Sequence, residues 1–157
     1  MKYEIAIQSA PSRQLAVVRD RRKWSELGGQ LIHLLDRVYA VVRAGKIIQS
    51  GQNVFLFRDG SPDGVTVEVG VEVASPFDDV DGVVCSATPA GEAASTRHVG
   101  PYSSLGEAHD AVVRWCKEHG RARANVSWEV YGDWNEDPAQ LETEVFYLLQ
   151  ENPSGAV

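Results

Sequence analysis

The sequence contains an internal repeat, which restricts the chain to folds built from two similar halves. The segment 24–28 (WSELG) recurs 78 residues later as 102–106 (YSSLG). Shorter matches follow in the same order: Pro11 with Pro89, Arg19 with Arg97, Asn53-Val54 with Asn125-Val126, and Glu68-Val69 with Glu144-Val145. Any one of these matches is short, so the inference rests on their shared order. It predicts a structural duplication, with half-repeats over about residues 1–77 and 78–150.

The hydrophobic pattern of the first half predicts four strands and one helix. The expected strands are residues 3–9, 14–20, 53–58 and 65–74. Residues 10–12 form the turn between the first two, and residues 59–64 form a hairpin turn. Between Trp24 and about Ala44, apolar residues recur at intervals of three and four, which predicts a helix ended by Gly45. In the last strand, alternation places one set of residues on a single face: Val67, Val69, Val71 and Val73, with Glu68 and Glu72 opposite.

The second half repeats this order of elements. The expected strands are residues 82–88, 92–98, 126–131 and 141–149. A helix is expected to begin near Ser104, where Ser104 and Glu107 fit a capping box, and to end at Gly120. Its buried stripe consists of Leu105, His109, Val112 and Cys116. Within that stripe we interpret His109 as a core or boundary histidine and Cys116 as a core residue.

The two halves together predict an α+β fold with pseudo-two-fold symmetry. Each half has a βαββ arrangement, and the whole has an antiparallel sheet, two main helices and a central groove. A chain of 157 residues suits one domain. We expect that domain over residues 1–150 and a flexible tail over residues 151–157.

The charge balance argues against a nucleic-acid partner. The chain has 15 basic and 22 acidic residues and a net charge of −7, whereas phosphate backbones require a basic surface. No apolar run is long enough to span a membrane, and the amino terminus lacks a signal-peptide pattern. Two cysteines are too few for a disulfide framework. These features predict a cytoplasmic protein with neither a membrane nor a direct nucleic-acid partner.

The carboxy-terminal third carries a recognisable string of motifs: RHVGPYSSLGEAHDAVVRWCKEHG, WEVYGDWNEDP and LETEVFYLL. It resembles the GyrI-like domain, the gyrase-inhibitor-like effector-binding fold also found at the C-termini of multidrug-responsive regulators. The matching residues are His98, Gly100, Pro101, Tyr102, Glu129, Tyr131, Pro138 and Glu144. The resemblance implies two halves that form a groove for bulky, often aromatic and cationic drugs, with a carboxylate matching Glu129 at its bottom. Because no helix-turn-helix precedes the motifs, we expect a stand-alone member rather than a transcription factor.

Glu129 is the strongest candidate for a binding residue. It lies in an apolar strand, where alternation places Glu129 and Tyr131 on one face. Desolvating a carboxylate is costly, and a cationic ligand offsets that cost. The structural alternative is a solvated Glu on an edge strand.

Glu144 is the second candidate carboxylate, in the last strand, where it shares a face with Phe146. Two carboxylates with different pKa values would suit a hydrolase, with one Glu activating water and Tyr131 orienting or protonating the leaving oxygen. The structural alternative is a buried Glu hydrogen-bonded to tyrosine or backbone.

Several aromatic residues are further candidates for the walls of the site, each with core packing or helix entry as the alternative. They are Phe55, Phe57, Tyr102, Trp115, Tyr39 and Trp134. On the repeat, Phe57 is the equivalent of Glu129, and Trp134 lies in a polar turn suited to a lid. Cys116 and His119 have a short, ligand-like spacing, but two ligands make no metal site, and we expect no metal or cofactor.

Three functional hypotheses follow. The leading one is a binding protein for bulky hydrophobic, cationic aromatic small molecules, used for sequestration or sensing. The second is a hydrolase for strained cyclopropanoid alkylating compounds, an activity that the resemblance implies for a minority of such domains, using Glu144, Glu129 and Tyr131. The third is a protein-binding inhibitor that acts through its acidic surface.

Overall fold

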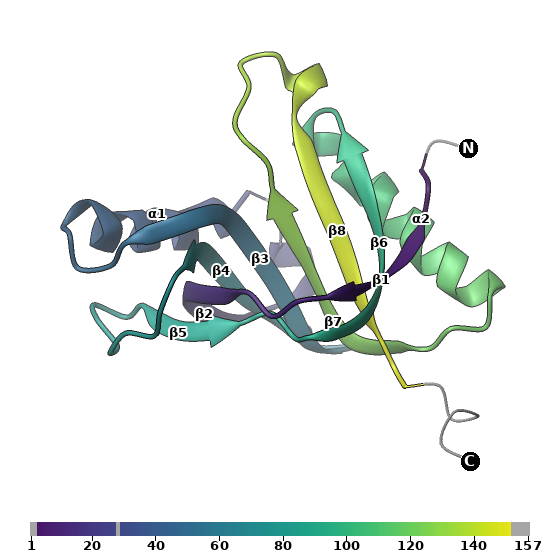
Figure 1. The fold of residues 1–157 in the computed structure, drawn as a ribbon, viewed down its shortest axis with the longest axis horizontal. Helices are drawn as coiled ribbons and strands as arrows, with labels where there is room; N and C mark the ends of the chain where they lie inside the picture. The colour runs from purple at the N-terminus through teal and green to yellow at the C-terminus, as the bar shows by residue number, and fades with distance from the viewer. Residues whose placement is uncertain (1–2, 28, 152–157) are drawn as a thin grey trace. The chain divides into compact units, whose positions relative to one another are not determined.

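Each half of the chain contributes a helix and antiparallel strands (Figure 1). The structure, a computed structural model, describes residues 3–27 and 29–151, so nearly all of the expected tail lies outside the described residues. The chain divides into two compact units. We call residues 12–88 the α1 unit, and residues 1–11 with 89–157 the α2 unit, after the helix that each contains.

In the α1 unit, helix α1 (Leu31–Arg43) packs on one face of four strands in the order β3-β4-β2-β5. The strands are β2 (Gln14–Arg22), β3 (Gln49–Ser61), β4 (Gly64–Val73) and β5 (Val84–Ala87). All four alternating valines of β4 are buried in the core beneath α1. Glu68 and Glu72 lie on the other face of β4. The predicted alternation is therefore confirmed.

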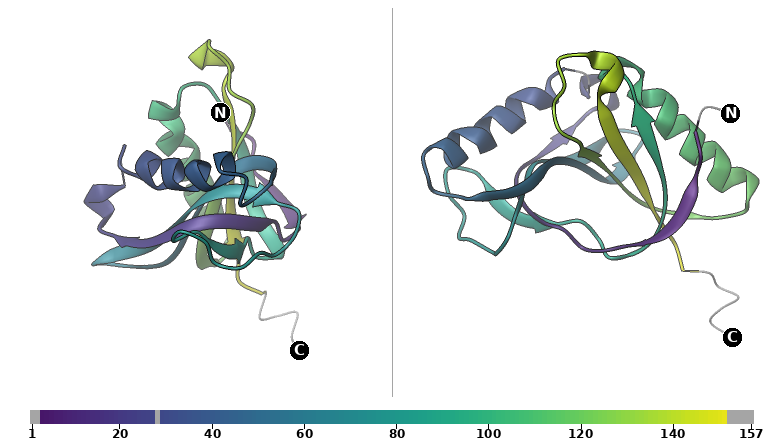
Figure 2. Two further views of the ribbon diagram at one scale, coloured as in Figure 1. Left: turned by 90° about the vertical axis from the view of Figure 1, so that its left-hand side faces the viewer. Right: turned by 45° about the horizontal axis from the view of Figure 1, so that its top comes forward.

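In the α2 unit, helix α2 (Leu105–Glu118) packs on strands in the order β1-β6-β8-β7. The strands are β1 (Ala6–Ala10), β6 (Gly91–Val99), β7 (Arg123–Tyr131) and β8 (Glu142–Leu149). The core between helix and strands consists of Ala94, Leu105, Ala108, Val112, Cys116, Val145 and Leu149. Figure 2 shows each helix lying along the strands of its own unit. The βαββ order and the α+β class agree with the prediction.

The two short strands β1 and β5 do not stay with the sequence half in which they occur. β1 pairs with β6, and β5 pairs with β2, so β1 and β2 form no hairpin. The repeated prolines lie at these crossovers, where Pro11 ends one segment and Pro89 begins another. The fixed negative φ of proline does not fit the positive φ that two-residue hairpin turns require at their first central position.

Both helices end in the same way, as the repeat predicts. Gly45 and Gly120 have φ angles of 76° and 64° and follow α1 and α2, respectively. The next residue in each case donates a backbone hydrogen bond to the last turn, Lys46 to Val41 and Arg121 to Cys116. This is the Schellman arrangement, in which glycine adopts the left-handed conformation without strain.

The predicted helix starts need two corrections. The first helix begins at Leu31, and Trp24–Glu26 instead form a 3₁₀ turn. The Gly28-Gly29 pair explains the difference, since each glycine costs a helix about 1 kcal/mol relative to alanine. The predicted capping box at Ser104 is also wrong. The Ser104 side chain makes no cap hydrogen bond, and its hydroxyl donates to the carbonyl of Pro101 at 3.0 Å.

Among the described residues, neither helix combines the length and the apolar character that crossing a bilayer would require.

Candidate functional site

Glu129 lies on the helix-facing side of β7 and is only 7% exposed. It pairs across the strands with Val145, which is part of the core against α2, and paired residues share a face. Tyr131 lies on the same side of β7, and its hydroxyl donates to Glu129 Oε1 at 2.7 Å. The prediction that Glu129 and Tyr131 share a face is confirmed.

Helix α2 brings a histidine to the second carboxylate oxygen. His109 Nε2 donates to Glu129 Oε2 at 2.6 Å. His109 Nδ1 lies 2.7 Å from the hydroxyl of Tyr147 on β8, and the two rings meet edge-on. We call Glu129, Tyr131, His109 and Tyr147 the carboxylate cluster. Each member is hydrogen-bonded to another, so a buried charge is held without an unpaired polar atom at the carboxylate.

Burial keeps both phenols of the cluster in their protonated form. Desolvation, followed by the nearby Glu129 carboxylate, raises the pKa of Tyr131 far above its usual value. Desolvation is also the main cause that raises the pKa of Tyr147 to about 12. At neutral pH both tyrosines are therefore O–H donors, and the cluster presents donors to one negatively charged centre.

Tyr102 extends the carboxylate cluster toward solvent. Its ring meets the ring of Tyr131 edge-on with centroids 5.3 Å apart, and it is 42% exposed. Tyr102 follows the HVGP turn, which a buried His98 holds. His98 Nε2 donates to the Pro101 carbonyl at 2.9 Å, and its Nδ1 lies 2.8 Å from the Tyr3 hydroxyl. These contacts indicate that His98 positions the turn.

Glu144 and Phe146 lie on the opposite face of the same strands. Glu144 pairs with Val130, the neighbour of Glu129, so the sheet of the α2 unit separates the two carboxylates. Phe146 stacks on Trp128 with centroids 5.3 Å apart. The structure therefore does not bring Glu144 to the carboxylate cluster, and a two-carboxylate mechanism there has no geometric support.

The remaining aromatic candidates lie apart from the carboxylate cluster or at the surface. Phe55 and Phe57 pack against the core beneath α1. Tyr39 also packs there, and its hydroxyl donates to Asn53 Oδ1. Trp115 stacks on His119 near the end of α2. Trp134 is 76% exposed, and its role as a lid stays a prediction.

Strand pairing also corrects the equivalence of Phe57 and Glu129. Phe55 pairs with Val69, and Glu129 pairs with Val145, which is the repeat partner of Val69. The counterpart of Glu129 is therefore Phe55. Sequence matching missed this because both pairings contain an irregularity near the start of β3 and of β7.

The charge of the cluster suits recognition of a cation or transfer of a proton. Arg123 lies over the ring of Tyr147 at 5.9 Å from its centroid, at the edge of the cluster. Within the described residues, no three His, Cys, Asp or Glu side chains gather as a metal site would require. The contacts of the carboxylate cluster allow it to act through hydrogen bonds, charge and aromatic faces.

Sequence reasoning missed Tyr147 as a site residue of the carboxylate cluster, and it also missed His109. His109 is half-buried on the strand-facing side of α2, where its partners are the Glu129 carboxylate and the Tyr147 hydroxyl rather than apolar side chains. A signal for His109 was present in the sequence. The predicted stripe of α2 faces the strands, so the ring of a histidine on it needs a hydrogen-bond partner there. Glu129, on the neighbouring strand, was the available one.

Comparisons with solved structures support the fold. The C-terminal domain of EcmrR has a TM-score of 0.78 at 21% identity, covering 97% of this chain and 100% of that chain. The structure of SAV2435 bound to tetraphenylphosphonium has a TM-score of 0.71 at 11% identity, covering 94% of both chains. A hydrolase encoded by lin2189 from Listeria innocua has a TM-score of 0.59 at 10% identity, covering 94% and 92%.

No curated protein matches the chain in sequence. A family model described as the GyrI-like small molecule binding domain, however, matches residues 3–149, nearly the whole chain. This match extends the resemblance from the carboxy-terminal third to both halves. The chain belongs to the GyrI-like family of small-molecule-binding domains.

Proposed function

We propose that this domain binds bulky hydrophobic, cationic aromatic small molecules in the cytoplasm, with Glu129 supplying the compensating charge. The observation that carries the proposal is a carboxylate only 7% exposed and bonded to Tyr131, whose ring in turn contacts Tyr102. A buried anion favours a ligand cation, and a tyrosine face adds about 0.5–2 kcal/mol of cation–π attraction. The similar structure of SAV2435 was determined with tetraphenylphosphonium, a ligand of this class.

Tyr131 and Tyr102 are the proposed aromatic contacts. The Tyr131 hydroxyl donates to the carboxylate. The ring of Tyr102 contacts the ring of Tyr131 edge-on and extends the site toward solvent. Their phenol groups stay protonated, so they offer apolar faces and no competing negative charge. This arrangement suits recognition by charge and shape rather than by a fixed set of hydrogen bonds, as expected for sequestration or sensing of varied compounds.

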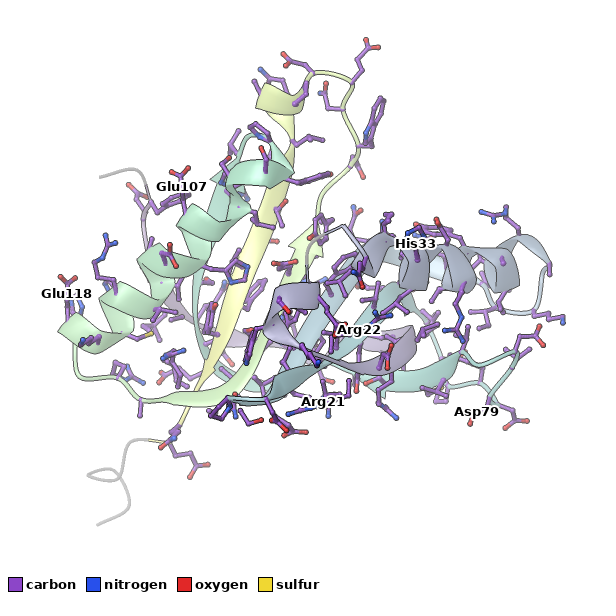
Figure 3. All side chains as sticks on the ribbon, turned by 180° about the vertical axis from the view of Figure 1, so that it is seen from behind. Arg21, Arg22, His33, Asp79, Glu107 and Glu118 are labelled. Carbon is purple, nitrogen blue, oxygen red and sulfur yellow. The ribbon has the colours of Figure 1, made fainter. Side chains whose placement is uncertain are left out.

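Calorimetric titration of tetraphenylphosphonium tests the proposal. We expect saturable binding by the wild type and at least about tenfold weaker binding by Glu129→Gln, which keeps the shape and removes the charge. Glu118→Gln is the matched control, because it removes one negative charge from an exposed position at the end of α2 (Figure 3). Equal affinity for Glu129→Gln and Glu118→Gln would contradict the assigned role of Glu129.

A hydrolase for strained cyclopropanoid compounds is the second candidate function. The contact that favours it joins the Tyr131 hydroxyl to Glu129 at 2.7 Å, and one similar fold is a hydrolase. In this reading Glu129 accepts a proton from water as the water oxygen bonds to a ring carbon. The ring C–C bond that breaks leaves its electron pair on the opened compound, which then takes the proton from Glu129, and Tyr131 orients the reacting groups. Incubation with a cyclopropanoid alkylating compound and detection of the water adduct tests it. Recovery of intact compound after stoichiometric binding would reject it.

A further inference from the structure

In the described structure both oxygens of the Glu129 carboxylate are occupied by side chains of the protein. Tyr131 donates to Oε1 at 2.7 Å, and His109 donates to Oε2 at 2.6 Å. Tyrosine carries no positive charge, whereas histidine gains one within the physiological pH range. His109 is therefore the one member of the carboxylate cluster that can take the place of a cationic ligand.

The bonding of His109 fits either of its charge states. Its Nε2 donates to Glu129 in both, while Nδ1 faces the hydroxyl of Tyr147 at 2.7 Å. A neutral ring accepts from that hydroxyl at Nδ1, and a protonated ring donates to its oxygen. Neither state leaves a ring nitrogen without a partner, so titration of His109 requires no rearrangement of the cluster.

The charge of the cluster nevertheless differs between the two states. With neutral His109, Glu129 contributes an uncompensated negative charge, which one cationic ligand neutralises. With protonated His109 the pair is already neutral, and an added cation meets a like charge in a weakly solvated place.

We infer that His109 determines the charge preference of the site, with neutral His109 admitting a cation at Glu129 and protonated His109 excluding it. Cation binding and protonation of His109 then exclude each other, so binding at mildly acidic pH expels one proton. This inference rests on the proposed function, and it assigns that site a pH-dependent specificity.

Other titratable and charged groups near His109 act on the same balance. They are Tyr131 and Arg123 on β7, Tyr147 on β8, His98 on β6, Tyr102 before α2, and Asp110 on α2. The tyrosines stay protonated through the relevant range because their pKa values are raised. The ring of His98 is bonded to Pro101 and Tyr3, away from the carboxylate.

The experiment is calorimetric titration of tetraphenylphosphonium from about pH 5 to pH 8, in two buffers of different ionisation enthalpy. For the wild type we expect affinity to rise with pH by up to about tenfold per unit, and release of close to one proton per ligand at the acidic end. His109→Gln keeps a donor for Glu129 and an acceptor for Tyr147 but does not titrate. We expect it to bind with an affinity that is independent of pH.

An uncharged ligand provides the second arm and needs no variant. Triphenylphosphine oxide has similar aromatic bulk, and its binding to the wild type should not depend on pH. Tetraphenylphosphonium binding that is flat with pH and releases no proton would overturn the role of His109 alone. No binding at any pH would overturn the proposed function as well. A pH dependence that persists in His109→Gln would assign the effect to another group and overturn the inference.

Discussion

The α1 and α2 units share the same elements but place their polar clusters on opposite faces of the strands. In the α1 unit the layer beneath the helix is apolar and includes Leu31, Phe55, Phe57 and Val71. At the corresponding positions of the α2 unit stand His109, Glu129, Tyr131 and Tyr147, the carboxylate cluster. One copy of the fold therefore has an ordinary core where the other has a site.

On the strand faces turned away from the helices, the buried charged group belongs to the α1 unit instead. In the α1 unit Glu68 is fully buried and bonded to Arg19 and Arg58 at 2.8 Å and 3.1 Å, and to the hydroxyl of Ser86. Its repeat partner Glu144 is only partly buried. The comparison shows that either face of this βαββ frame accepts a buried carboxylate when neighbouring side chains bond both of its oxygens.

Exchanging the residues at the paired helix positions 31 and 109 gives the largest expected change in unfolding free energy. Leu31→His places an unpartnered polar ring in an apolar core, and we expect a loss of about 3 kcal/mol in unfolding free energy. His109→Leu removes one donor to Glu129 but adds apolar burial, so we expect a loss of about 1 kcal/mol. Urea denaturation measures both. Equal losses would show that the helix-facing layers do not differ as described.

Alkaline stability distinguishes the units through Tyr147, whose counterpart Val71 does not titrate. The pKa of Tyr147 is about 12 in the folded state, against about 10 when unfolded. Between these values the unfolded chain binds fewer protons, so stability is full below pH 10 and falls by about 1.4 kcal/mol per unit as pH rises toward 12. Tyr147→Phe should remove this contribution to the slope, measured by denaturation at stepped pH with tyrosinate absorbance. An unchanged slope would show that Tyr147 titrates normally.

The two repeated glutamates should differ in their importance for stability. Glu68→Gln removes the charge that holds two arginines, and we expect a loss of about 2 kcal/mol. Glu144→Gln at the matching, partly exposed position should cost less than about 1 kcal/mol. Thermal and urea unfolding of both variants provide the comparison. A larger loss for Glu144→Gln than for Glu68→Gln would contradict the conclusion that the buried charge network belongs to Glu68.

Replacing the glycine after either helix should cost the same stability, and this is the smallest change that we expect. Gly45→Ala and Gly120→Ala each force a side chain into the left-handed region, where the added carbon meets no atom within 4 Å outside the adjacent residues. We expect each to cost about 1 kcal/mol, which denaturant unfolding can resolve. Clearly unequal losses would show that the two Schellman turns are not equivalent.

Local patterns in the sequence were enough for the fold class and part of the site. The duplication, the helix-ending glycines and the valine face of β4 follow from repeats and periodicity, because these depend only on neighbours along the chain. The shared face of Glu129 and Tyr131 follows in the same way. The GyrI-like family was also identifiable, since its motifs occur together in one stretch.

Tertiary structure alone decided which residues meet. Alternation sets the faces within one strand, but pairing register sets which face of the next strand lies beside it, so only the pairing separates Glu144 from Glu129. Likewise, only the pairing of β1 with β6 assigns β1 to the α2 unit, and only the pairing register makes Phe55 the counterpart of Glu129. The sequence offered Glu129 as a partner for His109, but only the way α2 lies across β7 brings the two side chains within hydrogen-bonding distance.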